Sequence, residues 1–168
     1  MSNAQRAAAI IDDAGGRVVG RTKLQKITYL LCAAGFEDGF EFEYRHYGPY
    51  SEGLSDAVWE ARLDGIVNEE EKAAQWGGTY SIFSTVERVA HESSPEKKRL
   101  IQIAAGADSI VLELAATAVF LARKNYPDPW DETSRRKPQK AERDRLDRAK
   151  ALLAELRTVR VPTELPAI

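Results

Sequence analysis

Apolar residues recur every three or four positions over much of this chain, and that spacing predicts amphipathic helices. In the second of these helices, Thr22 and Gln25 have the spacing of a capping box, so we expect the helix to start at Thr22. The segment that follows Asp108 is apolar on nearly every side, and we expect it to be the central buried helix. The helices expected from the whole pattern cover about residues 3–13, 22–34, 52–63, 95–106, 108–124, 131–136 and 141–156.

β-Prone residues predict a few short strands between these helices. Residues 40–44 alternate aromatic residues and glutamate, which is the pattern of a half-buried strand. Residues 66–67 and 79–83 flank a polar, glycine-bearing loop, so they predict a β-hairpin. We place the run Glu69-Glu70-Glu71 in the loop of this hairpin, which makes the loop acidic.

The order of these elements predicts the fold class. Helix, helix, strand, turn, helix and hairpin follow one another, and this order is compatible with a winged helix. We predict an α+β fold that is mostly α, with a winged-helix-like part over about residues 1–90 and a helical bundle around the buried central helix over about residues 91–157. Residues 1–157 are expected to form a single compact domain, and residues 158–168, which contain two prolines, a flexible tail.

The most distinctive stretch of the chain is Tyr44-Arg45-His46-Tyr47-Gly48-Pro49-Tyr50-Ser51. Glycine permits unusual backbone angles and proline fixes φ, so we expect the chain to turn at Gly48-Pro49. Ser51 then stands at the N-cap of the next helix. The histidine and tyrosine rings would give the turn an amphipathic surface that suits contact with a partner.

Composition excludes several classes of protein. The chain has 168 residues, of which 43% are hydrophobic and 30% charged, and its net charge is −2. This balance permits a sizeable core and lacks the basic excess of a whole-chain nucleic-acid binder. No apolar run reaches the roughly 20 residues of a membrane span, and no signal-peptide pattern is present, so we expect a cytoplasmic location and no membrane partner. Cys32 is the only cysteine, which excludes an intramolecular disulfide and fits a small buried hydrophobe.

Charge is unevenly distributed near the C-terminus. Residues 135–150 contain eight basic residues and three acidic ones, interleaved at helical spacing. This pattern is typical of a solvated helix face, and the alternative is a surface for an anionic partner. The residues that would form the anionic-partner surface are Arg135, Arg136, Lys137, Lys140 and Arg143.

Three charged residues stand out within the predicted helices. Lys23 and Lys26 fall off the apolar stripe of their helix, so they either face solvent or pair with a carboxylate elsewhere in the fold. Glu113 is the only charged residue between Asp108 and Arg123 in the central helix. A buried carboxylate needs a partner, and we expect an arginine or lysine from the first half of the chain. Thr117 lies one turn later and can share that environment.

Recognisable catalytic and metal-binding patterns are missing. Two histidines and one cysteine cannot build the usual Cys/His structural zinc site. The sequence has no phosphate-binding glycine loop, no dinucleotide-binding motif, no HExxH pair and no GxSxG nucleophile elbow. We therefore expect no enzymatic activity, no catalytic residues, no metal and no cofactor.

Several short motifs in order resemble the Panacea (SocA-like, DUF4065) domain group and its YwgA-like relatives. The motifs are Thr22–Tyr29, Tyr44–Ser51, Asp64–Val67, Leu112–Thr117 and Arg136–Pro138, and Leu112–Thr117 and Arg136–Pro138 are closest to the YwgA-like branch. No catalytic residue comes with the resemblance, and its motif residues imply a structural and interaction core. These residues are Lys23, Gln25, Lys26, Tyr29, His46, Tyr47, Gly48, Pro49, Tyr50, Glu113 and Thr117.

The resemblance implies a small cytoplasmic bacterial or archaeal protein that works by protein contact. Panacea domains occur as antitoxins, as adaptors for proteolysis and near phage-defence genes. The leading hypothesis is a non-enzymatic protein-interaction module, antitoxin-like or adaptor, with a toxin or effector as its partner. The alternative is a winged-helix DNA-binding transcriptional regulator that contacts phosphates with its C-terminal basic helix. A homodimer through the apolar helices is compatible with either hypothesis.

Overall fold

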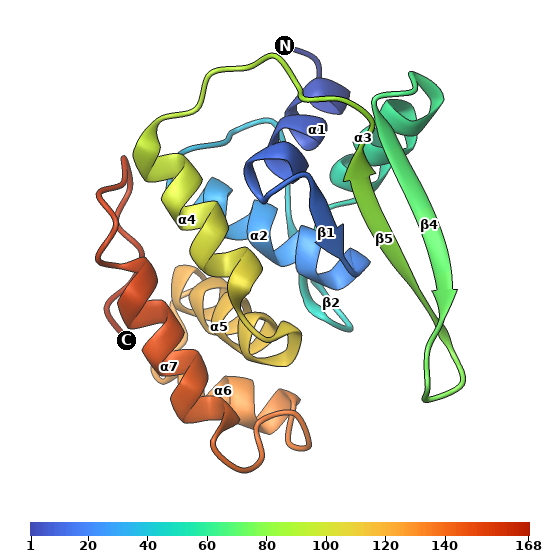
Figure 1. Ribbon diagram of the computed structural model, residues 1–168. Helices are drawn as coiled ribbons and strands as arrows, with labels where there is room; N and C mark the ends of the chain where they lie inside the picture. The colour runs from blue at the N-terminus through green and yellow to red at the C-terminus, as the bar shows by residue number, and fades with distance from the viewer.

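The computed structural model describes residues 1–168 and contains seven helices and five short strands (Figure 1). The fold is mixed α+β and mostly helical, as the hydrophobic pattern predicted. The elements are α1 (Asn3–Asp13), β1 (Arg17–Val19), α2 (Arg21–Ala33), β2 (Glu43–Arg45), β3 (Gly48–Tyr50), α3 (Glu52–Leu63), β4 (Val67–Ala73), β5 (Thr79–Thr85), α4 (Pro95–Gly106), α5 (Ser109–Arg123), α6 (Pro129–Arg136) and α7 (Arg145–Leu156).

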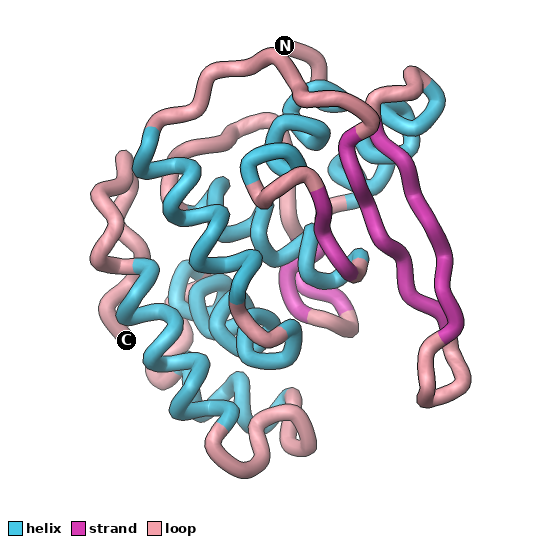
Figure 2. The backbone as a smooth tube through the Cα atoms, viewed as in Figure 1, coloured by secondary structure: helices cyan, strands magenta, loops and turns pink.

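The first half has the element order of a winged helix. Strands β1, β5 and β4 form an antiparallel sheet in that spatial order, and α1 packs against α3 and β5. The β4–β5 hairpin projects beyond the helices, and Figure 2 shows it at one edge of the molecule, with β1 between it and the helices. None of the helices combines the length and apolarity that crossing a membrane requires.

The acidic residues of the hairpin lie in its strand, so the prediction of an acidic loop was wrong. Glu69, Glu70 and Glu71 belong to β4, opposite Phe83, Ile82 and Ser81 of β5. An edge strand tolerates charged side chains because one of its sides has no neighbouring strand. The loop itself covers residues 74–78.

The Tyr-Gly-Pro stretch forms a second, smaller hairpin rather than a simple break. Strand β2 is shorter than the predicted strand over residues 40–44, and it pairs with β3, where Arg45 lies opposite Gly48. The turn therefore falls at His46-Tyr47, two residues earlier than predicted. Gly48 has a φ of +87°, a conformation that favours glycine, and this explains the glycine of the motif.

Helix α5 is the centre of the second half. Asp108 caps it by accepting the backbone N–H groups of Ile110 and Val111, and the helix packs against α2, α6, α7 and β3. One cluster of buried side chains includes residues from both halves of the chain. The prediction of a buried central helix is confirmed.

Three predicted helix starts were wrong. Gly20, not Thr22, is the N-cap of α2 and has no side chain to cap it, and Gln25 of the predicted capping box binds the Ser51 backbone instead. Asp128 rather than Asp131 caps α6 by accepting the N–H of Asp131. Helix α7 begins at Arg145, because residues 138–144 form turns in which Arg143 has a φ of +60°.

The C-terminal segment packs against the body, contrary to the expected flexible tail. The side chains of Val159 and Leu165 are buried. The N–H of Thr163 donates to the carbonyl of Ala34 (3.0 Å), and Arg123 donates to the carbonyl of Glu164 (2.9 Å). Its apolar residues therefore add to the core, which a proline count alone could not indicate.

Replacement of Gly48 by alanine tests the close approach of the small hairpin to α5. A Cβ at Gly48 would lie 2.5 Å from Oγ1 of Thr117, and the φ is positive as well. We expect Gly48→Ala to lower the free energy of unfolding by about 3 kcal/mol. Gly65→Ala is the matched control, because Gly65 has a φ of +74° but open space around its Cβ. Its loss should stay near 1 kcal/mol in the same urea titration, about the lower end of the cost of positive φ.

The double variant Gly48→Ala/Thr117→Ala separates the two causes. Relative to Thr117→Ala alone, the double variant should lose only the part of the unfolding free energy that backbone strain at position 48 accounts for. Equal losses for Gly48→Ala with and without Thr117 would contradict the steric explanation.

Candidate functional site

Lys26 is fully buried, so the expectation of a solvated face was wrong for this residue. Its side chain is among the largest with almost no exposure, and Nζ donates to the backbone carbonyl of Pro49 (2.8 Å). Burial lowers the pKa of Lys26 to about 8, because desolvation disfavours the ammonium; Glu113 opposes the shift, and Lys137 and Lys140 add to it. Periodicity could not reveal this, since α2 is covered both by α5 and by β3.

Gln25 binds the backbone of Ser51, the residue that follows β3. Its Nε2 donates to the carbonyl of Ser51 (2.9 Å), and its Oε1 accepts the N–H of Ser51 (2.8 Å). The hydroxyl of Ser51 accepts the N–H of Leu54 and caps α3, as predicted. Adjacent residues of α2 therefore fix the β3 backbone and the start of α3.

Glu113 is buried and lies between two lysines from the second half of the chain. Its carboxylate is 3.0 Å from Nζ of Lys137 and 2.8 Å from Nζ of Lys140. The expected burial is confirmed, but the expected partner from the first half was wrong, because residues after α6 fold back over α5. Lys137 also donates to the carbonyl of His46 (3.2 Å), so the carboxylate reaches the small hairpin through a lysine.

The aromatic rings at the turn of the small hairpin are exposed to solvent. Tyr47 is 58% exposed, and Nζ of Lys140 lies 4.7 Å from its ring centroid. His46 is also exposed. The guanidinium of Arg136 lies 4.6 Å from the ring centroid of Tyr44. The cluster of Lys26, Glu113, Lys137 and Lys140 therefore fixes the hairpin backbone and leaves its tip available.

Other predicted site residues have packing roles. Lys23 donates to the carbonyls of Ala105 (3.0 Å) and Ala107 (2.7 Å) at the end of α4, where a cation complements the helix dipole. Tyr29 packs edge-on against Phe42 at a centroid distance of 5.2 Å. The Thr117 hydroxyl is buried beside Gly48 and has no hydrogen-bond partner. Cys32 is half-buried, and burial raises the pKa of its thiol to about 12, which makes it unreactive.

Four of the five basic residues proposed for an anionic partner are engaged in contacts within the chain. Lys137 is buried, and Lys140 pairs with the same carboxylate. Arg136 stacks between two tyrosines, and Arg135 pairs with Asp131 (2.6 Å). Of the five, Arg143 alone is without an ion pair or an aromatic contact, so the proposed surface loses most of its charge to internal interactions.

A groove of 330 Å³ lies between α2, α3 and the larger sheet, and sequence reasoning missed it. Its floor is apolar, formed by Leu24, Leu54, Val58 and Phe83, and the rings of Tyr50 and Trp59 line it. These residues come from separate elements, so no local pattern could show the groove. The available signal was Trp59, a large aromatic residue that the helical pattern placed beside the buried stripe of α3.

Glu69 organises the charged side of this groove. It accepts hydrogen bonds from Arg21 (2.7 Å), Arg62 (3.0 Å) and the hydroxyl of Ser81 (2.5 Å). Burial raises the pKa of this carboxyl, but the hydrogen bonds and the two arginines outweigh burial and lower it. Glu69 thus stays ionised and holds both guanidinium groups at the groove.

The chain is similar to YwgA of Bacillus subtilis (strain 168), with 29% identity over 110 residues, which span 62% of this chain and 66% of YwgA. YwgA is uncharacterised, and the match covers slightly less than two thirds of its length. The YwgA-like part of the predicted resemblance is confirmed as a distant homology. No family model and no solved structure matches the chain.

Removal of the Glu113 carboxylate tests the charge cluster. We expect Glu113→Ala to lower the free energy of unfolding by about 3 kcal/mol, because a buried lysine and a partly buried one lose their counter-charge. Glu142→Ala is the control, an exposed acid of the nearby turns, and should change stability by less than about 0.5 kcal/mol. Denaturant titration of both variants decides the question; a Glu113→Ala loss as small as that of the control would rule out the arrangement.

The pH dependence of stability tests the burial of Lys26. Its pKa of about 8 in the folded chain lies below the ordinary lysine value of 10.5, so between these values the unfolded chain binds more protons. The wild-type free energy of unfolding should therefore rise with pH over this interval relative to Lys26→Met, by up to about 1.4 kcal/mol per pH unit. Lys124→Met, at an exposed position, should behave as the wild type does. If parallel urea titrations of wild type and Lys26→Met showed no pH-dependent difference, the lowered pKa of the buried Lys26 would be contradicted.

Proposed function

We propose that this chain is a non-enzymatic protein-interaction module, antitoxin-like or adaptor, that docks a partner protein on the outer face of α3 and the adjoining groove. One observation carries the proposal: Trp59 and Leu63, four residues apart on α3, are 55% and 69% exposed. Residues four apart lie on one helix face, so the two side chains form one apolar surface. Large apolar side chains on a rigid helix are typical anchors of protein interfaces.

The groove beside Trp59 supports the same docking surface. Arg62 lies 5.1 Å from the Trp59 ring centroid, and its ion pair with Glu69 restrains it, so the tryptophan is presented on an ordered support. The apolar floor of the groove would accept an aliphatic or aromatic side chain of the partner. The exposed rings of His46 and Tyr47 at the tip of the small hairpin offer a separate aromatic contact, as the sequence suggested.

The antitoxin-like part of the proposal rests on the resemblance to Panacea domains. Those domains act on unrelated toxins through protein contact, and the match to YwgA adds no activity of its own. Protein contact is the property that antitoxin and adaptor share, so the proposal is stated at that level and the partner is a toxin or an effector.

The winged-helix element order favours a second candidate, a DNA-binding regulator. In such proteins the recognition helix, to which α3 corresponds in the element order, lies in the major groove of DNA between the two phosphate backbones. Here the exposed residues of α3 include Glu52, Asp56 and Glu60, and β4 adds Glu70 and Glu71. Acidic side chains repel phosphates, so the protein partner is the stronger candidate for this face.

A pull-down from native lysate, with and without nuclease, tests the proposed function. We expect the tagged chain to recover one stoichiometric protein that survives nuclease, and the variant Trp59→Ala/Leu63→Ala to lose it at least about tenfold, as for an interface anchor. Trp76→Ala is the matched control, since Trp76 is 77% exposed at the tip of the larger hairpin. Because all three side chains are exposed, the variants should keep the wild-type thermal midpoint.

Two outcomes would overturn the proposed function. Retention of the partner by the Trp59→Ala/Leu63→Ala variant would refute the proposed docking surface on α3. Recovery of nucleic acid, with duplex retardation that weakens steeply with salt, would establish the regulator instead.

A further inference from the structure

Helix α1 ends with two adjacent acidic residues, and no basic residue of its last turn neutralises their charge. Asp12 and Asp13 occupy its last turn, which carries no basic residue. The C-terminal end of a helix is its negative end, so two carboxylates there are unfavourable without a nearby cation. Asp13 is also 8% exposed, which raises the cost of its charge.

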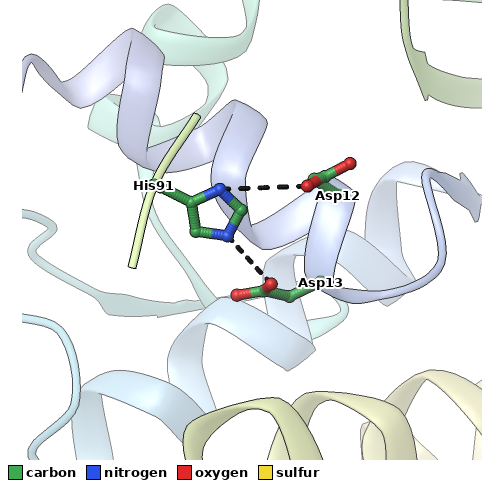
Figure 3. Close-up of side chains that lie close together, drawn as sticks. All are labelled: Asp12, Asp13 and His91. Carbon is green, nitrogen blue, oxygen red and sulfur yellow. Dashed lines mark hydrogen bonds and ion pairs between the residues drawn. The ribbon is translucent and has the colours of Figure 1, made fainter. Parts of the chain in front are cut away.

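The connector between β5 and α4, residues 86–94, brings a histidine to this helix end. His91 lies between the two carboxylates, with Nε2 2.9 Å from Oδ1 of Asp13 and Nδ1 3.8 Å from Oδ2 of Asp12 (Figure 3). Nδ1 is also 2.7 Å from the carbonyl oxygen of Val89. The imidazole is 6% exposed, so little water reaches it.

The partners of the ring define its protonation. Both ring nitrogens face oxygen atoms, which are acceptors. A neutral imidazole has one N–H group, so one nitrogen lone pair would point at an oxygen lone pair in a buried site. The imidazolium form donates from both nitrogens and satisfies both acceptors, and it supplies the cation that the end of α1 lacks.

We infer that His91 is held as an imidazolium and is a proton-dependent clasp that fastens the connector over residues 86–94 to the C-terminal end of α1. A second bond reinforces the attachment, since the hydroxyl of Ser93 donates to Oδ2 of Asp13 (2.6 Å). The next residue, Ser94, caps α4 by accepting the N–H of Lys97 (3.1 Å). The clasp therefore sets where α4 begins, and loss of the proton loosens the junction between the two halves of the chain.

No other cation substitutes for His91. Neither Asp12 nor Asp13 has a lysine or arginine within ion-pair distance. On α4, Lys97 is paired with Glu37 (3.6 Å), and Lys98 and Arg99 form no ion pair. On α3, Arg62 is paired with Glu69. The titratable group of β5 is Tyr80. The other charged residues of β1 and of the connector are exposed and form no ion pair; they are Arg17, Glu87, Arg88 and Glu92.

The same three side chains could in principle hold a metal ion, but the geometry favours a proton. Their ligand atoms lie within 4.8 Å of one another. The carboxylates of Asp12 and Asp13 lie next to different ring nitrogens, however (Figure 3). Nδ1 is in addition within hydrogen-bond distance of the Val89 carbonyl. A metal would need the carboxylates to converge on one nitrogen lone pair.

Nitrogen-15 NMR of the full chain tests the charge state of His91. His46, the other histidine, is exposed and is the internal reference. As pH rises, we expect two-bond proton–nitrogen spectra to show both His91 nitrogens protonated at a pH where His46 has lost a proton. Variants His91→Gln and His46→Gln assign the signals. Loss of a His91 proton at or below the pH at which His46 loses its own would overturn the inference, and so would stoichiometric Zn²⁺ binding that His91→Gln abolishes.

Hydrogen exchange tests the clasp itself. Because the charged imidazole contributes at low pH and is lost as pH rises, protection of the connector amides should exceed that of His91→Gln about tenfold near pH 6 and match it near pH 9. His46→Gln should follow the wild type at both values. Equal protection in wild type and His91→Gln at the lower pH would show that the ring packs without fastening the connector, and would overturn the proposal. Asp13→Asn gives an independent variant, expected to lose the same pH dependence.

Discussion

The arrangement of the small hairpin depends on the ion pairs that the buried carboxylate of Glu113 forms with Lys137 and Lys140. Ions taken out of water each lose several kcal/mol of solvation, so such a cluster persists only where charges and hydrogen bonds are matched. Here the carboxylate binds Lys137 and Lys140, and Lys137 also binds the His46 carbonyl. Any shift of α6 relative to α5 would separate these groups, and the same contact therefore fixes two helices and the hairpin.

Helix α2 holds the hairpin from the opposite side, and the two supports explain the motif. Gln25 and Lys26 are neighbours in sequence and bind different backbone groups, those of Ser51 and Pro49. The hairpin is thus held by its carbonyls and amides, while the Tyr47 ring remains 58% exposed. Its backbone is the structural part of the motif, and its rings are the part that can contact something else.

The hydrophobic pattern predicted the helices well and their charged contacts poorly. The bounds of α1 and α3 agree with the pattern because each has one continuous apolar face and a local start or stop signal, such as Ser51. The burial of Lys26 depends on β3 crossing α2, and the contact of Lys137 with His46 joins residues 91 positions apart. Spacing along one helix contains no information about either. The groove was not predictable for the same reason, since several elements form it.

The use of cations inside the fold determines what α3 can bind. Lys26, Lys137 and Lys140 serve the hairpin, and Arg21 and Arg62 are bound to Glu69. Among the outward-facing acids of α3, Glu52 pairs with Arg45, whereas Asp56 and Glu60 have no ion pair. A winged-helix order is therefore combined with an acidic, tryptophan-bearing face, which is unsuited to phosphate. A protein that covers Trp59 and brings basic groups of its own would gain both apolar burial and charge complementarity at this face, and that combination is the physical reason for proposing a partner there.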